Sequence, residues 1–199
     1  MTQVKLTKNE LRFQQIRLEQ LNRYLPTLQL KKSLLQVQVN EARAETALVE
    51  EKYNQSYSAV KEYGALLAVE NVSIDFKQAT KVKTIRKHYE NIAGVEIPYF
   101  EGIDFEEISY DLFETPSWVD GAIAGLKTMI GNNVKLHIAK EKTAALEKEL
   151  REVSIRVNLF EKRLIPRALT NIKKIKIFLG DLDLSAVSQT KVAKSKIKR

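Results

Sequence analysis

The sequence predicts a mainly α-helical protein: a long antiparallel coiled coil of an N-terminal and a C-terminal helix, with a small β-hairpin and short-helix region at the end away from the termini. Only seven Gly and four Pro interrupt the 199 residues, which favours long regular elements. Apolar residues recur at helical spacing through the first and last thirds of the chain. Between them, a short stretch alternates with period two, as strands do.

The first helix, expected within residues 1–70, carries an apolar repeat that alternates steps of three and four from residue 4 to residue 67. Fourteen of its nineteen positions are apolar or Tyr. A heptad sustained over nine repeats is typical of a coiled-coil seam. Pro26 lacks an N–H group, so we expect it to kink the helix or break it locally. The exceptions in the repeat are Thr7, Gln14, Lys32, Thr46 and Ser56.

The second helix, expected over residues 117–184, should begin after Ser117, which can act as N-cap with Asp120 at the capping-box position. Its apolar stripe runs from Leu146 to Leu182 with a mean spacing of 3.6 residues. Three consecutive steps of four occur between residues 160 and 172, which is a stutter that locally unwinds a supercoil. Pro166 lies inside this stutter, so we expect a bend there. The segment "GDLDLSAVSQT" should loosen the helix, leaving residues 185–199 as a basic tail.

The central region, residues 71–116, contains a predicted β-hairpin near residues 95–109. Apolar and aromatic side chains alternate there on both sides of Gly102, which we expect to form the turn. Pro98 places its strand at a sheet edge, because proline cannot donate a ladder hydrogen bond. A hairpin this small should pack against the adjacent helices.

Composition excludes several classes of function. The chain has no cysteine and therefore no disulfide or thiolate site, and no 18-residue apolar run that could span a membrane. The N-terminus lacks the apolar core of a signal peptide, so we expect a cytoplasmic protein. The net charge is +8, and residues 162–199 alone contribute +9. This basic end could meet nucleic acid, an anionic membrane surface or an acidic protein cavity.

No pattern in the sequence assembles a catalytic, cofactor or metal site. The chain contains neither a GxxxxGK[ST] nor a GxSxG motif, and its two histidines, His88 and His137, lie far apart without ligand spacing. A run of carboxylates flanks the predicted hairpin and is better explained as a solvated rim than as an acid–base pair. These carboxylates are Asp104, Glu106, Glu107 and Asp111.

Three segments resemble one family, the D subunits of V-type and A-type ATPases, which form the central rotor shaft. The first is "VNLFEKRLIP", whose residues Val157, Asn158, Glu161, Ile165 and Pro166 match the family's VN-x-x-E-x-x-x-IP segment. The second is "GVEIP", where Gly94, Val95 and Pro98 match the central GV-x-x-P. The third, "LTKNEL", is similar to the start of the family's first helix. They occur in the family's order along nearly the whole chain.

The resemblance implies a noncatalytic shaft without a cofactor. In such proteins the paired terminal helices are inserted into a hexamer of catalytic A and regulatory B subunits, and rotation couples ATP turnover to proton or sodium-ion translocation. The other end binds the small F subunit and sits on a funnel-shaped coupling subunit above the membrane ring. The implied place is the cytoplasmic side of the membrane, peripheral to it, with no direct membrane insertion and no nucleic acid.

The basic residues of the second helix fall largely outside its apolar stripe, so they are candidates for a face that meets acidic loops of the hexamer. The alternative is a free-standing coiled-coil adaptor that binds nucleic acid or an anionic surface through its basic C-terminal tail. The predicted hexamer-contact face comprises Arg156, Lys162, Arg163, Arg167, Lys173, Lys174 and Lys176.

Overall fold

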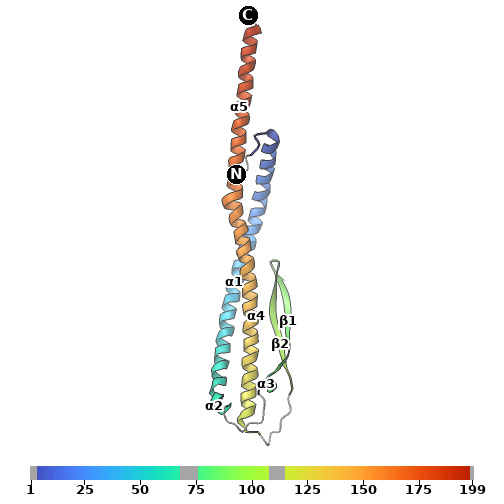
Figure 1. Ribbon diagram of the computed structural model, residues 1–199, viewed down its shortest axis with the longest axis vertical. Helices are drawn as coiled ribbons and strands as arrows, with labels where there is room; N and C mark the ends of the chain where they lie inside the picture. Colours follow the sequence, from blue (N-terminus) through green and yellow to red (C-terminus); the bar gives the residue numbers. More distant parts are fainter. Residues whose placement is uncertain (1–3, 68–75, 108–114, 198–199) are drawn as a thin grey trace. The chain divides into compact units, whose positions relative to one another are not determined.

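A computed structural model describes residues 4–67, 76–107 and 115–197 (Figure 1). It confirms a mainly helical chain with long N- and C-terminal helices and a central two-stranded antiparallel hairpin. The chain divides into two compact units, described separately below: unit 1 is residues 1–33 with 151–199, and unit 2 is residues 34–150. The elements in order are α1 (Lys8–Glu62), α2 (Gly64–Leu67), α3 (Phe76–Ala79), β1 (Val82–Ile92), β2 (Val95–Phe105), α4 (Trp118–Leu159), the π-helical turn η1 (Phe160–Leu164) and α5 (Ile165–Ile197).

The predicted seam is confirmed from Leu11 to Tyr63, whereas Thr7 is exposed. Every seam residue from Leu11 to Tyr63 is buried or half-buried, although several of these residues are polar. The helix begins at Lys8 and not near Val4, because Thr7 caps it: its Oγ1 accepts a hydrogen bond from the Glu10 N–H at 3.2 Å. The helix continues through Pro26, so the expected local break is wrong.

In unit 2, α1 and α4 run antiparallel, since contacts shift toward lower residue numbers on α4 as they advance along α1. Arg43 pairs with Glu147 at 2.6 Å, whereas Asn132 Nδ2 donates to Ser56 Oγ at 3.2 Å further along. Leu35, Val39 and Leu146 are almost completely buried in the same seam. Burial of this apolar strip is the main source of stability for a two-helix unit.

A polar layer interrupts the apolar seam of unit 2. The hydroxyl oxygens of Thr46 and Thr143 lie 3.0 Å apart across the two helices. Each hydroxyl also reaches a backbone carbonyl one turn earlier, that of Ala42 at 2.8 Å and that of Ala139 at 2.9 Å. The two alanines are buried, and their small side chains allow the helices to approach closely. Both threonine hydroxyls are therefore satisfied inside the seam.

The hairpin is present, but its predicted location is wrong. β1 pairs with β2 in antiparallel register, and the turn lies at Ala93–Gly94 instead of at Gly102, which sits inside β2 opposite Arg86. Both turn residues have positive φ, 53° and 83°, and the Gly94 N–H donates to Asn91 Oδ1 at 2.9 Å. An Asn two positions before a positive-φ pair is a turn signal that outweighs one glycine in an alternating strand. The last two residues of the predicted hairpin, 108 and 109, lie outside the described residues.

The hairpin of β1 and β2 lies along α4 (Figure 1), and three lysines of α4 contact aromatic rings on it. Lys127, Lys135 and Lys142 place their ammonium groups 5.7, 5.2 and 4.2 Å from the centroids of aromatic rings on β2. Those rings belong to Phe105, Phe100 and Tyr99 respectively. Ile97 and Pro98 are buried, and Pro98 lines a small pocket together with Ile138 of α4. The predicted packing of the hairpin on a helix is confirmed.

The second long helix begins at Trp118, directly after the predicted cap Ser117. Trp118 stacks on Phe76 of α3 with ring centroids 6.3 Å apart, which attaches α3 to the start of α4. At its other end the helix continues to Ile197. The expected loosening after residue 180 and the separate tail at 185–199 are therefore wrong for the described part. A single Gly180 costs a helix only about 1 kcal/mol, and the lysines and alanines that follow are good helix formers.

The π-helical turn η1 coincides with the predicted stutter. The Ile165 N–H donates to the Phe160 carbonyl five residues earlier, so the turn is wider than an α-helical one. Pro166 follows immediately. In a regular helix its ring would clash with the carbonyl of Lys162. Because Lys162 lies in the widened turn, the helix continues past the proline into α5.

Replacing Pro166 with Ala should raise the free energy of unfolding by about 1 kcal/mol, less than the roughly 3 kcal/mol difference between these residues in a regular helix. The gain is smaller because the π turn already accommodates the ring. Urea unfolding followed by circular dichroism at 222 nm would measure it. A stabilisation of about 3 kcal/mol would show instead that the wide turn relieves nothing.

Candidate functional site: the basic side of unit 1

The seven predicted contact residues all belong to unit 1, and all are exposed. Arg156 lies near the end of α4, Lys162 and Arg163 lie in η1, and the other four lie on α5. The apolar stripe between them is buried, with Val157 and Ala168 each 3% exposed. The structure thus separates an apolar side, which packs on α1, from a basic outer side. Leu182, predicted as the last stripe residue, is exposed.

Pairing of the two chain ends makes unit 1 far more basic than the C-terminal segment alone. Its 20 Lys and Arg oppose six Asp and Glu, a formal charge of +14, whereas unit 2 has 13 Lys and Arg against 19 Asp and Glu, a charge of −6. The basic residues in the first 33 residues, among them Lys5 and Arg17, were missed as site residues because the prediction rested on the charge of the C-terminal segment alone. The predicted antiparallel pairing could have indicated them, because it places the first residues of the chain beside the C-terminal helix.

The six carboxylates of the unit are too few to neutralise its 20 Lys and Arg. Arg156 pairs with Glu152 at 3.7 Å and Arg23 with Glu19 at 3.3 Å, both one helical turn apart on exposed surfaces. Exposed pairs of this kind contribute roughly 0–1 kcal/mol and leave the surrounding potential positive. A surface of this charge attracts anionic partners and rejects cationic ones.

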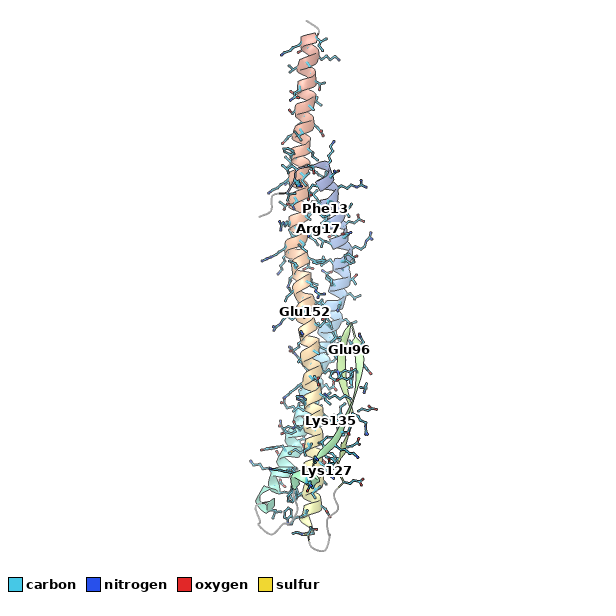
Figure 2. All side chains as sticks on the ribbon, turned by 45° about the vertical axis from the view of Figure 1, so that its right-hand side comes forward. Phe13, Arg17, Glu96, Lys127, Lys135 and Glu152 are labelled. Carbon is cyan, nitrogen blue, oxygen red and sulfur yellow. The ribbon has the colours of Figure 1, made fainter. Side chains whose placement is uncertain are left out.

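A groove of about 490 Å³ lies between the start of α1 and α5 in unit 1. Its lining includes apolar Phe13 and Leu164, the amide of Asn171 and the cations Arg17 and Arg167. Figure 2 shows Phe13 and Arg17 on α1 where it runs beside α5. No residue of this groove other than Arg167 belonged to the predicted face.

The segment that carries the VN-x-x-E-x-x-x-IP pattern contributes both to the seam and to the surface. Val157 is buried in the seam, Ile165 is half-buried, and Asn158 is exposed. Glu161 accepts a hydrogen bond from Gln29 Nε2, which ties the π turn to α1. In the other pattern, Gly94 forms the hairpin turn, and Val95 and Pro98 lie in β2.

Two of the carboxylates beside the hairpin and one of the two histidines have structural partners, whereas His137 is exposed on α4. Asp104 pairs with Arg86 at 2.6 Å, and Glu106 pairs with Lys81 at 3.0 Å. Glu107 is exposed, and Asp111 lies outside the described residues. His88 stacks on Tyr99 with ring centroids 5.3 Å apart.

Within residues 4–67, 76–107 and 115–197, no group of three His, Cys, Asp or Glu residues could hold a metal ion. In the same ranges, no helix combines the length and apolarity needed to cross a membrane.

Comparison with known proteins assigns the family. A family model that describes the D subunit of ATP synthase matches residues 10–195. Relatives include the V-type ATP synthase D subunit of Chlamydia abortus, 43% identical over 100% of this chain and 95% of the relative, and that of Chlamydia pneumoniae, 40% identical over 98% and 93%. That of Chlamydia trachomatis serovar L2 is 39% identical over 100% of this chain and 98% of the relative. With its paired helices and central hairpin, the chain belongs to the ATP synthase D-subunit family.

Proposed function

We propose that the protein is the noncatalytic central-stalk subunit of a V/A-type ATPase, a rotor shaft that couples ATP hydrolysis or synthesis to proton or sodium-ion translocation. The partners are the A and B subunits of the hexamer around unit 1, with the small F subunit and the funnel-shaped coupling subunit beyond them. The complex sits at the cytoplasmic face of the membrane, and this subunit is peripheral to it. Family membership supports the assignment.

The observation that carries the proposal is the combination in unit 1 of a largely apolar helix seam with a formal charge of +14. The seam supplies stiffness, which a shaft needs to transmit torque. The outer charge supplies electrostatic complementarity to acidic walls, which steers assembly and penalises wrong partners. A protein without a binding partner would gain nothing from this concentration of positive charge in one unit.

The π turn gives the proposed shaft an irregularity within its second helix. A rotor must present different sides to the catalytic sites around it, and an axially uniform rod would act on all of them alike. The wide turn and the change of apolar period at Phe160–Leu164 break that uniformity. Unchanged ATP-driven rotation by an assembled chain in which this turn has been made regular would remove the support for this part of the proposal.

Reversing the charge of Arg163, Arg167 and Lys174 to Glu should weaken binding to the A/B hexamer at least tenfold and reduce the torque of ATP-driven rotation. Close charge pairs across protein interfaces contribute about 1.5–7 kcal/mol each. The matched control reverses three exposed lysines of unit 2, Lys52, Lys61 and Lys83, with the same change in net charge. Binding titrations and single-molecule rotation would compare the two variants.

Equal affinity and torque for both variants would rule out the basic face as the contact surface. Absence of any binding to the hexamer by the unmodified chain, together with strongly salt-dependent binding to DNA, would support the adaptor function instead.

A further inference from the structure

Two buried seam residues, Gln14 and Ala168, line the groove of unit 1. Gln14 occupies a seam position of α1 where the repeat otherwise places apolar residues, and it is 7% exposed. Ala168 on α5 is 3% exposed, and its single methyl group fills less of the layer than the Leu and Ile side chains elsewhere in the stripe. A large apolar side chain in place of Ala168 would fill part of the groove, whereas Gln14 contributes a polar group to its lining.

One wall of the groove carries an aromatic side chain that is not buried by the rest of the chain. Phe13 lines the groove and is 56% exposed, although a phenylalanine offers one of the largest apolar areas for burial. Leu164 and Val4 also line the groove and add apolar surface. An exposed aromatic beside a hollow is typical of a residue buried by a partner.

The rim of the groove is cationic. Lys5, Arg17 and Arg167 surround it, against one carboxylate, that of Glu10. The Glu10 carboxylate is partly engaged inside the unit, because Oε1 accepts a hydrogen bond from Gln14 Nε2 at 2.8 Å. Within the described ranges, neither Lys5 nor Arg17 forms an ion pair, so both charges are available to a ligand.

We propose that this groove binds an acidic peptide segment of a subunit that surrounds unit 1, with an apolar side chain of the segment against Phe13 and a carboxylate between Lys5 and Arg17. This inference rests on the proposed function and assigns a specific docking point to it. Inorganic phosphate would satisfy the cations but leave Phe13 exposed. A nucleic-acid strand would bring its phosphates toward Glu10, whereas a peptide can place backbone N–H groups there and donate to that carboxylate.

The test uses the full chain in the assembled complex. Phe13 is replaced by the photo-crosslinking residue p-benzoylphenylalanine, the complex is irradiated, and the attached molecule is identified by mass spectrometry. The expected product is a peptide of a surrounding subunit with Asp or Glu within a few residues of the crosslink. The matched control carries the same residue at Tyr24, which is 61% exposed on the same helix and does not line the groove. It should not label that peptide.

A second measurement compares Arg17→Glu with Arg23→Glu. Both arginines are exposed on α1, but Arg23 pairs with Glu19 outside the groove. Arg17→Glu should weaken hexamer binding about tenfold, as loss and reversal of one interfacial charge does, and Arg23→Glu by less than about threefold. Circular dichroism at 222 nm would verify that both variants retain the helical content of the unmodified chain.

Crosslinking of Phe13 to a neutral or basic peptide, to nucleic acid or to lipid would overturn the inference, and so would equal effects of the two arginine substitutions. The chain could bind the hexamer and rotate while the crosslinking residue at position 13 labels no acidic segment. In that case the inference fails and the proposed function stands. If the unmodified chain does not bind the hexamer, both fail.

Discussion

Replacing Leu35 with Ala should lower the free energy of unfolding by about 3 kcal/mol, because the change leaves a cavity in the seam of unit 2. Leu35 is completely buried, as is Leu146 on the facing helix. A two-helix layer has few neighbouring side chains that could move in to fill the lost volume. Urea unfolding monitored at 222 nm, with the slope checked for constancy, would give the difference.

Leu30 provides the matched control for this experiment. It lies five residues earlier on α1 and is 71% exposed, so Leu30→Ala removes the same atoms from a surface position. We expect a change within about 0.5 kcal/mol. Comparable losses for both variants would mean that the stability of the chain does not depend on the α1 seam as described.

Replacing Lys142 with Glu should cost about 2–4 kcal/mol and release the hairpin from α4. Lys142 Nζ lies 2.8 Å from Glu45 Oε2 and 4.2 Å from the centroid of the Tyr99 ring, and its side chain is only 11% exposed. One substitution would therefore place a carboxylate against another carboxylate and against the negative face of an aromatic ring. Hydrogen exchange of the β1 and β2 amides should accelerate, which reports the hairpin directly.

Lys140→Glu is the control for the hairpin experiment. Lys140 lies on the same helix and pairs with Glu50 at 3.0 Å, but its side chain is 54% exposed. Exposed pairs contribute roughly 0–1 kcal/mol, so the loss should stay in that range and hairpin exchange should not change. Faster exchange in both variants would indicate that overall charge, and not the site of Lys142, holds the hairpin.

The Lys142 contact should persist through neutral pH and weaken only in strong alkali. Burial alone would lower the pKa of Lys142, but the hydrogen bond and charge of Glu45, together with Tyr99, outweigh it and raise the pKa above its ordinary value of 10.5. A raised pKa in the folded state stabilises the fold fully below 10.5, and this contribution disappears as pH rises through the folded-state pKa.

The seam could be predicted almost residue by residue because a heptad is a local and repetitive pattern. The polar exceptions Gln14, Lys32, Thr46 and Ser56 still lie at seam positions, since the period and not each residue determines the face. The stutter likewise indicated where the helix changes, although not that the change takes the form of a π turn. Neither conclusion required knowledge of distant contacts.

The location of the hairpin and the presence of the groove could not be predicted from a local sequence pattern. β1 is mostly exposed, with only Val82, Lys87 and Ile92 half-buried, so it has no clear alternation and was not recognised as a strand. The groove depends on Gln14 and Ala168 lying together, which only the pairing of the chain ends determines. Charge counted along the sequence likewise missed the contribution of α1 to unit 1.

The polar layer of Thr46 and Thr143 has a mechanical consequence. If α1 slid one heptad past α4, each hydroxyl would lose its partner across the interface and face an apolar layer. Each hydroxyl would keep its bond to the carbonyl of its own helix, so the loss is that of the hydrogen bond between the helices, about 0.5–1.5 kcal/mol. Apolar layers alone would resist sliding much less, because one leucine layer can replace another. Two hydroxyls 3.0 Å apart thus favour the observed axial register of α1 and α4 over one shifted by a heptad.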